Sequence, residues 1–184
     1  MVRISSTVLT VLVGLTSLSR ATAVDDVVRY ADELREDVFP PVKTAVEDLP
    51  GSSSELQVCH VVAIQAGFVN VALQNEKIGE AVMNTTNLDF IQGGRIFCKF
   101  QAAHHVLMEL INGIVSKNSS FIEDKAWLRA PMRAQLTEMR AGHDAVTKTL
   151  RDRVPEILKE HVQALNNDGD QQLAIAQSAF DPLK

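Results

Sequence analysis

The segment from Leu128 to Pro155 constrains the fold more than any other part of this chain. Within it, one side chain in every three or four belongs to a nearly apolar stripe: Leu128, Met132, Leu136, Met139, His143, Val146, Leu150 and Val154. This spacing places the stripe along one face of a helix of about seven turns. Because charged and polar residues occupy the other faces, further helices must cover the stripe. The segment therefore predicts a helical bundle.

Four other segments repeat apolar residues at helical intervals, namely 25–49, 55–84, 88–116 and 155–180. Polar turns separate them, so consecutive helices are expected to run in alternating directions. The predicted fold class is all-α, an up-and-down bundle of about five helices. One domain is expected to include all of residues 24–184.

Three places in these segments leave a choice open. Pro40-Pro41 cannot lie inside a regular helix, which predicts either a kink or two short helices meeting there. The β-branched residues of 55–84 also suit a buried strand, but helix is favoured because about thirty residues pass without a turn signal. The polar run from Asn166 to Asp170 is expected to kink or split the last helix.

The first residues are identified as a secretory signal peptide. Arg3 provides a positive start, Val8–Leu18 an apolar core, and Ala21-Thr22-Ala23 a cleavage site of the A-x-A kind. The apolar run is too short for a membrane anchor. The domain organisation is thus predicted to be a signal peptide at 1–23 and a mature domain that is secreted.

The charge of the mature chain limits its partners. The signal peptide contains Arg3 and Arg20 but no acidic residue, so its removal takes the formal charge from −5 to −7. An acidic chain without a basic run is not expected to bind nucleic acid or anionic membranes. Neither a second spanning apolar run nor a hydrophobic C-terminal GPI signal occurs, so no transmembrane anchor is expected.

Modification and disulfide sites are suggested by short patterns. Asn84-Thr85-Thr86 and Asn118-Ser119-Ser120 are sequons at predicted helix connections, where a glycan would be exposed. Cys59 and Cys98 are the two cysteines, and an oxidising compartment favours a disulfide between them. In a plain hairpin they would lie ~25 Å apart at ~1.5 Å rise per residue. A disulfide therefore requires the second helix to break or the two helices to pack other than as neighbours; otherwise both cysteines remain buried free thiols.

The sequence contains none of the usual catalytic or metal-binding motifs. His104 and His105 point to different sides of one helix, and no H-E-x-x-H spacing occurs around any histidine. His143 interrupts the stripe and is interpreted as a satisfied or partly exposed histidine. The run Asn166–Asp170 fails as a calcium loop because its first and twelfth positions are Ala164 and Ile175. We therefore expect no metal, no cofactor and no enzymatic activity.

The mature chain resembles the fungal hydrophobic surface-binding protein family, which includes cell-wall galactomannoproteins. The resemblance is best between Leu110 and Phe180 and depends on Lys117, Phe121, Leu136, Asp144, Thr147, Leu150, the Val154-Pro155 junction, Ala174, Ala176 and Ala179-Phe180. The chain departs from the family by its two cysteines, by Pro40-Pro41 and by its higher content of Met, His and Arg.

This resemblance implies a secreted, non-enzymatic protein that is wall-associated or free. Members bind hydrophobic surfaces, some recruit secreted esterases, and related five-helix bundles hold a fatty acid between their helices. Methionines in the stripe suit an adaptable apolar site, although such a stripe is ordinarily core. The residues expected to contact an apolar ligand are Val62, Val69, Phe100, Leu107, Leu136, Met139 and Val146.

Two other functions fit the sequence. A secreted helical bundle of this size could act as an inhibitor or effector through its outer surface, although the four-cysteine framework of plant invertase inhibitors is missing. An enzyme assembled from dispersed residues is the third alternative. A continuous apolar cavity of ~300 Å³ or more would favour ligand storage, whereas a fully packed interior would favour action through the surface.

Overall fold

The structure is a computed structural model that describes residues 23–50, 55, 57–121 and 127–181. The signal-peptide prediction falls on residues 1–22, outside this part of the chain. Residues 23–33 are helical and continue into a π-turn and six further elements. These are η1 (Leu34–Val38), α2 (Phe39–Glu47), α3 (Val58–Asn84), α4 (Phe90–Ser116), η2 (Asn118–Phe121), α5 (Arg129–Arg153) and α6 (Glu156–Ala179).

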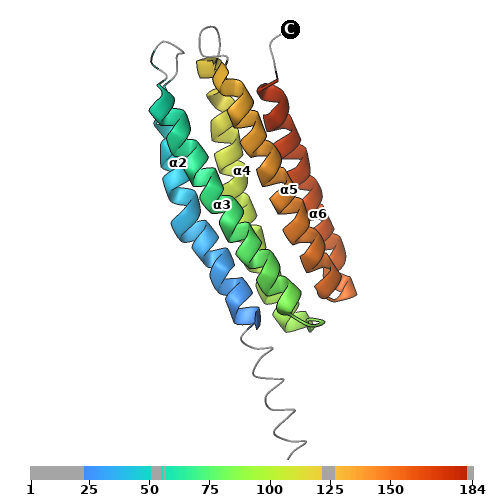
Figure 1. The fold of residues 1–184 in the computed structure, drawn as a ribbon. Helices are drawn as coiled ribbons and strands as arrows, with labels where there is room; N and C mark the ends of the chain where they lie inside the picture. The colour runs from blue at the N-terminus through green and yellow to red at the C-terminus, as the bar shows by residue number, and fades with distance from the viewer. Residues whose placement is uncertain (1–22, 51–54, 56, 122–126, 182–184) are drawn as a thin grey trace, which may run out of the picture.

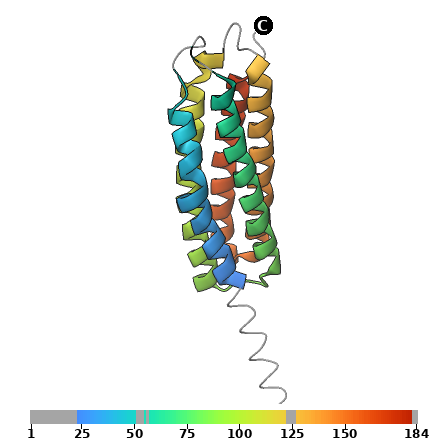
Figure 2. The ribbon, with the colours of Figure 1, turned by 60° about the vertical axis from the view of Figure 1, so that its left-hand side comes forward.

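The helices form an up-and-down bundle, as the sequence predicts (Figure 1). Residues 23–47 form one continuous helical segment, called the first helix below, which packs between α3 and α4 (Figure 2). On the other side of the bundle, α3 packs on α5, α5 on α6, and α6 on α4. The five helices thus close a ring in which each contacts two neighbours. The segment 55–84 is helical from Val58, so the alternative of a buried strand is excluded.

The apolar stripe of α5 forms the centre of the core. Its apolar members are all buried, with exposed fractions between 0% and 5%: Leu128, Met132, Leu136, Met139, Val146, Leu150 and Val154. α5 ends at the Val154-Pro155 junction because a residue before proline favours an extended backbone, and Val154 adopts one. Pro155 then precedes the first turn of α6, where its missing N–H needs no partner.

Pro40 and Pro41 neither break the first helix nor split it in two. The turn Leu34–Val38 widens to a π-turn, in which the Phe39 N–H donates to the Leu34 carbonyl, five residues earlier. The prolines follow in the first turn of α2, where a backbone N–H has no helical partner to lose. The predicted interruption is therefore a local widening of a continuous helix.

The last helix is also continuous, so the predicted split at Asn166–Asp170 does not occur. α6 runs from Glu156 to Ala179 through this polar run. Asn166 and Gly169 are buried against α5, where contacts with that helix hold the run helical. Tertiary contacts thus override a local sequence preference for a turn.

α3 buries a different face from the one its valines suggest. Val61, Ile64, Phe68 and Val71 are at most 2% exposed, whereas Val62 is 52% and Val69 is 49% exposed. Both sets have helical spacing, and the buried set contains the larger Ile64 and Phe68 side chains. The expectation that Val62 and Val69 face the interior is therefore wrong.

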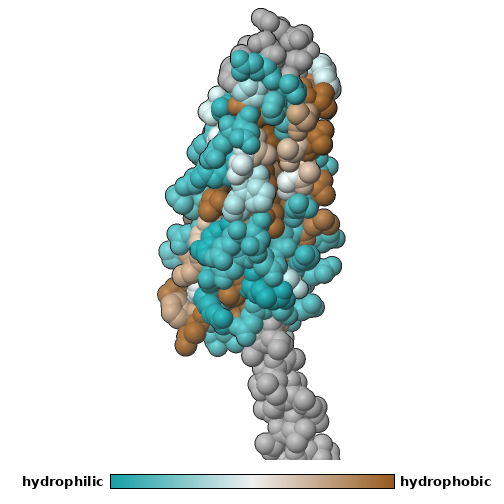
Figure 3. Space-filling model, turned by 90° about the vertical axis from the view of Figure 1, so that its left-hand side faces the viewer, coloured by the Kyte–Doolittle hydropathy of each residue, from teal (hydrophilic) through white to brown (hydrophobic). Residues whose placement is uncertain are grey.

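The outward valines are part of an exposed apolar face on α3, which consists of Val58, Val62, Val69 and Leu73. A run of apolar side chains is visible along one edge of the upper half of the molecule in Figure 3. Among the described helices, α3 alone is long and apolar enough to cross a membrane by length and composition, contrary to the sequence-based expectation that no second run of spanning length occurs. In the bundle it lies against the first helix and α5.

The cysteines and sequons lie at or near the surface. Cys59 and Cys98 are free and exposed, so neither the predicted disulfide nor the alternative of buried thiols holds. Asn84 is exposed at the end of α3, and Asn118 is half-buried in η2. Both sequons thus occur at helix connections as predicted, although Asn118 is less exposed than expected. Glycosylation itself stays a prediction.

Candidate functional site

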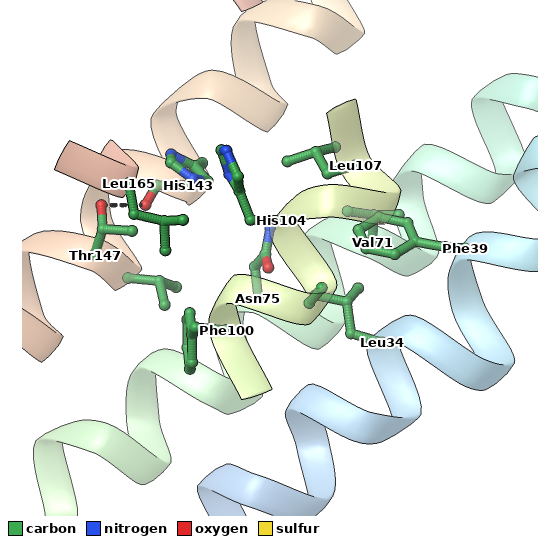
Figure 4. Close-up of a pocket in the computed structure, with 12 residues that line it drawn as sticks. Leu34, Phe39, Val71, Asn75, Phe100, His104, Leu107, His143, Thr147 and Leu165 are labelled. Atoms are coloured by element: carbon green, nitrogen blue, oxygen red, sulfur yellow. Dashed lines mark hydrogen bonds between the residues drawn. The ribbon is translucent and has the colours of Figure 1, made fainter. Parts of the chain in front are cut away.

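A cavity lies at the centre of the ring, and side chains from all five helices line it. The first helix contributes Leu34 and Phe39, and the other lining residues are Val71, Asn75, Phe100, Ala103, His104, Leu107, His143, Val146, Thr147 and Leu165. Figure 4 shows how these side chains converge from helices that are distant in sequence. The cavity is mainly apolar, with polar side chains from α3, α4 and α5.

The cavity is small in this conformation, and it does not reach the ~300 Å³ expected above for ligand storage. Its volume is about 30 Å³, whereas small-molecule sites usually measure ~300–1,000 Å³. It has room for a buried water rather than for an acyl chain. Large side chains such as Phe39, Phe100 and Leu107 occupy the surrounding space, and all three are at most 9% exposed. A larger guest would therefore have to displace them.

A shallow groove on the outside of the bundle approaches the cavity. It follows the seam between α3 and α5, and its lining includes the small residues Ala72, Gly79 and Gly142 as well as Glu76 and Glu80. Asn75 and Val146 line both the groove and the cavity. The groove and the cavity therefore lie next to each other at this seam.

The π-turn of the first helix adjoins the cavity. Leu34 begins the turn, Phe39 follows it, and both side chains line the cavity. The first helix is joined to α4 by three ion pairs at the surface: Asp25–Arg95 (2.7 Å), Asp32–Lys99 (2.9 Å) and Lys43–Glu109 (3.1 Å). To α3 it is joined by Gln74, whose buried amide donates to the Tyr30 carbonyl (3.0 Å) and to Glu33 (2.9 Å).

Two histidines form the polar side of the cavity. The rings of His104 on α4 and His143 on α5 have centroids 5.6 Å apart, and Figure 4 shows them side by side. His104 Nε2 lies 2.8 Å from a carboxylate oxygen of Asp168 on α6. His104 Nδ1 is buried and has no hydrogen-bond partner. His105 is 80% exposed, which confirms that the adjacent histidines point to different sides of α4.

His143 is held in its neutral form. Burial lowers its pKa to about 4, and the nearby His104 acts in the same direction. Asp144, Asp170 and Asp168 oppose this shift but do not overcome it. His143 is thus uncharged near neutral pH and cannot attract an anion by charge.

A layer of polar contacts between α5 and α6 positions His143. The Thr147 hydroxyl donates to the His143 carbonyl (2.7 Å) and also contacts the Asn166 amide oxygen, while the Asn166 amide donates to Asp144 (3.2 Å). Gly169 lies directly beside the His143 ring, where a Cβ would come within 2.4 Å of its Cε1 atom. Asn166 and Gly169 of the polar run thus pack against this part of α5.

The charged groups outside the cavity pair with one another. Arg140 donates two hydrogen bonds to the Asp170 carboxylate, at 2.5 and 2.8 Å, and these bonds lower the pKa of Asp170. Asp144 pairs with Lys148 (2.7 Å), which lowers its pKa as well. Within the described part of the chain, no group of three or more His, Cys, Asp or Glu side chains could hold a metal ion.

The structure brings together only some of the residues that the sequence suggested as ligand contacts. Phe100, Leu107 and Val146 line the cavity. Leu136 and Met139 are buried in the core away from it, and Val62 and Val69 face outward. His104, His143 and Asn75 were missed as lining residues. Sequence spacing could have found His104, because it follows Phe100 by four residues and precedes Leu107 by three.

The chain shares its fold with helical proteins of known structure that hold fatty acids. AFMP4P in complex with palmitic acid aligns with a TM-score of 0.73 at 15% identity, over 88% of this chain and 99% of that chain. Ligand-binding domain 2 of the Penicillium marneffei MP1 protein, complexed with multiple arachidonic acids, aligns with a TM-score of 0.66 at 12% identity, over 89% of this chain and 94% of that chain. Domain 1 of the same protein, complexed with arachidonic acids, aligns with a TM-score of 0.63 at 12% identity, over 83% of this chain and 99% of that chain.

These identities establish a common fold and no more. No family model matches the chain, and no curated protein sequence matches it.

The close packing of Gly169 on His143 predicts opposite effects of two glycine substitutions. Gly169→Ala is expected to lower the free energy of unfolding by about 1–2 kcal/mol, because overpacking outweighs the helix preference of alanine. Gly94→Ala is the matched control, since no atom lies within 4 Å of its added Cβ, and it should raise stability by up to ~1 kcal/mol. Urea denaturation measures both, and equal effects would contradict the packing assigned to Gly169.

The lowered pKa of His143 predicts a loss of stability in mild acid. The unfolded chain takes up a proton on this histidine below its ordinary pKa of 6.5, whereas the folded chain does so only near pH 4. Stability should therefore fall between pH 6.5 and 4, by about 3 kcal/mol from this residue. His143→Phe should remove the part of the pH dependence of stability that comes from this residue. His105→Phe, on the exposed side of α4, should leave that pH dependence unchanged. Denaturation midpoints measured across this pH range test the prediction. If the stability of His143→Phe falls with pH as steeply as that of the wild type, the burial of a neutral ring is contradicted.

Proposed function

We propose that this protein binds a long-chain fatty acid or a similar aliphatic lipid at the centre of its helical ring. The observation that carries the proposal is the cavity lined by all five helices, in a fold shared with proteins that hold palmitic and arachidonic acids. Each methylene moved from water into the core contributes ~0.8 kcal/mol, so a long chain gains ~10 kcal/mol before ordering costs.

The ring has to widen to admit such a chain. Phe39, Phe100 and Leu107 would rotate away from the centre, and the first helix would move outward from α3 and α4. The ion pairs that fasten it to α4 lie at the surface, where each contributes only ~0–1 kcal/mol. The π-turn next to the cavity provides a point at which this helix can bend. The α3–α5 groove shares Asn75 and Val146 with the cavity and is the route by which the chain would enter.

The biological setting belongs to the same proposal. The signal peptide predicted at residues 1–23 supports secretion, and the resemblance to hydrophobic surface-binding and cell-wall galactomannoproteins supports a role at or outside the cell wall. A secreted esterase is the partner that this resemblance implies. The protein would act by binding rather than by catalysis, consistent with neighbours named as ligand-binding domains.

A second candidate function uses the exposed apolar face of α3. Val62, Val69 and Leu73 are about half exposed, and no charged residue occurs between Val58 and Asn75. Such a face could adsorb to an extended hydrophobic surface without any guest in the core. Under this alternative, a charge placed on the face, as in Val69→Glu, should abolish lipid association, while substitutions at the cavity should leave it unchanged.

Delipidated protein titrated with palmitic acid tests the interior site. Native mass spectrometry should show one bound molecule for the wild type. Val146→Phe fills the cavity and should weaken binding ~5–150-fold, since inserted atoms in a packed core cost ~1–3 kcal/mol. Val69→Phe, the same change on the outer face, should bind as the wild type does.

Circular dichroism verifies that each variant folds. A wild type that binds no fatty acid, or a folded Val146→Phe protein that binds as tightly as the wild type, would contradict storage in the core. Should Val146→Phe not fold, Phe100→Ala replaces it. Without ligand, that variant is expected to be ~3–5 kcal/mol less stable than the wild type. Palmitic acid should then raise the free energy of unfolding more for the variant than for the wild type.

A further inference from the structure

The Nδ1 atom of His104 is a buried polar atom that lacks a partner. The His104 side chain is 9% exposed, and Nδ1 makes no hydrogen bond in the structure. An unsatisfied buried acceptor or donor costs ~1–3 kcal/mol, so native proteins contain few of them. Because His104 lines the central cavity, its missing partner is expected to come from whatever occupies that cavity.

The hydrogen bond made by the other ring nitrogen, Nε2, determines whether Nδ1 accepts or donates. Nε2 faces the Asp168 carboxylate at 2.8 Å, and a carboxylate can only accept, so Nε2 carries a hydrogen. In the neutral ring, Nδ1 is then an acceptor. In the protonated ring, Nδ1 becomes a donor, and Asp168 balances the positive charge.

The groups around Nδ1 narrow the class of ligand. No lysine or arginine occurs among the residues that line the cavity, and His143 is neutral because its pKa is lowered to about 4. His104 Nδ1 is thus the buried lining nitrogen without a partner that can hydrogen-bond a carboxyl group. Asn75 and Thr147 add polar atoms on the same cavity, and Phe100, Leu107 and Leu165 line it with apolar surface. The site therefore combines one polar anchor with an apolar chamber.

We propose that His104 Nδ1 binds the carboxyl group of an aliphatic acid whose chain lies in the cavity. The arrangement holds one shared proton: the acid donates O–H to neutral Nδ1, or the imidazolium donates Nδ1–H to the carboxylate. In both forms the net charge of Asp168, His104 and the ligand carboxyl group is −1. This assignment rests on the proposed function and adds which end of the lipid is recognised, and by which residue.

The experiment compares palmitic acid with methyl palmitate, which has the same chain but no ionisable carboxyl group. Dissociation constants are measured for the wild type, for His104→Phe and for His105→Phe, a matched substitution one residue away on the exposed side of α4. His104→Phe should weaken palmitic acid by ~10–100-fold, as expected for a lost hydrogen bond to a charged group. Methyl palmitate should change less than ~3-fold, and His105→Phe should change neither ligand.

The outcomes separate this inference from the function on which it rests. If neither ligand binds the wild type, lipid binding itself fails, and the anchor fails with it. If both ligands bind and His104→Phe weakens them equally, or weakens neither, the lipid is stored without recognition at His104. In that case the partner of Nδ1 is a buried water.

A measurement on the wild type keeps the inference testable even if His104→Phe does not fold. The Nδ1 nitrogen-15 signal of His104 should move on adding palmitic acid and stay in place on adding methyl palmitate. Equal movement with both ligands would overturn the assignment.

Discussion

The closed ring of five helices is the constraint on which the rest of this structure depends. Helices that pack at ~8–10 Å between axes place a pentagon's centre about 7–8.5 Å from each axis. A helix with its side chains has a radius of ~5–6 Å, which leaves a central channel of about 2–3 Å radius. A ring of four helices nearly closes this space. Five helices leave a channel as wide as an alkyl chain, and either large side chains or a guest must fill it.

In the structure described here, side chains fill most of that channel. Phe39, Phe100 and Leu107 occupy its centre, and about 30 Å³ remains. The α5 stripe supports this arrangement by binding α3 and α6 on either side. Where the stripe is interrupted by His143, α6 comes so close that only glycine fits at position 169. The polar side of the cavity is thus built by the packing of α5 on α6, and its shape depends on that contact.

The sequence was sufficient to predict the elements, because helical spacing and turn chemistry are local signals. The α5 stripe, its end at Val154-Pro155 and the helix-to-helix connections all follow from such signals. The face that α3 buries could not be predicted, since two apolar stripes compete and long-range packing chooses the one with Ile64 and Phe68. The continuous helices at Pro40 and Asn166 likewise depend on a widened turn and on contacts with α5.

The candidate site was predictable only in part, because a stripe extends beyond the cavity that it borders. Val146 lies level with the cavity, whereas Leu136 and Met139 lie on the same face of α5 but pack elsewhere in the core. A nuclear Overhauser measurement between the methylenes of bound palmitic acid and labelled side chains tests most directly whether the lipid lies inside the helical ring. Contacts to Phe100, Leu107 and Val146 are predicted, whereas contacts confined to Val62, Val69 and Leu73 would contradict an interior site.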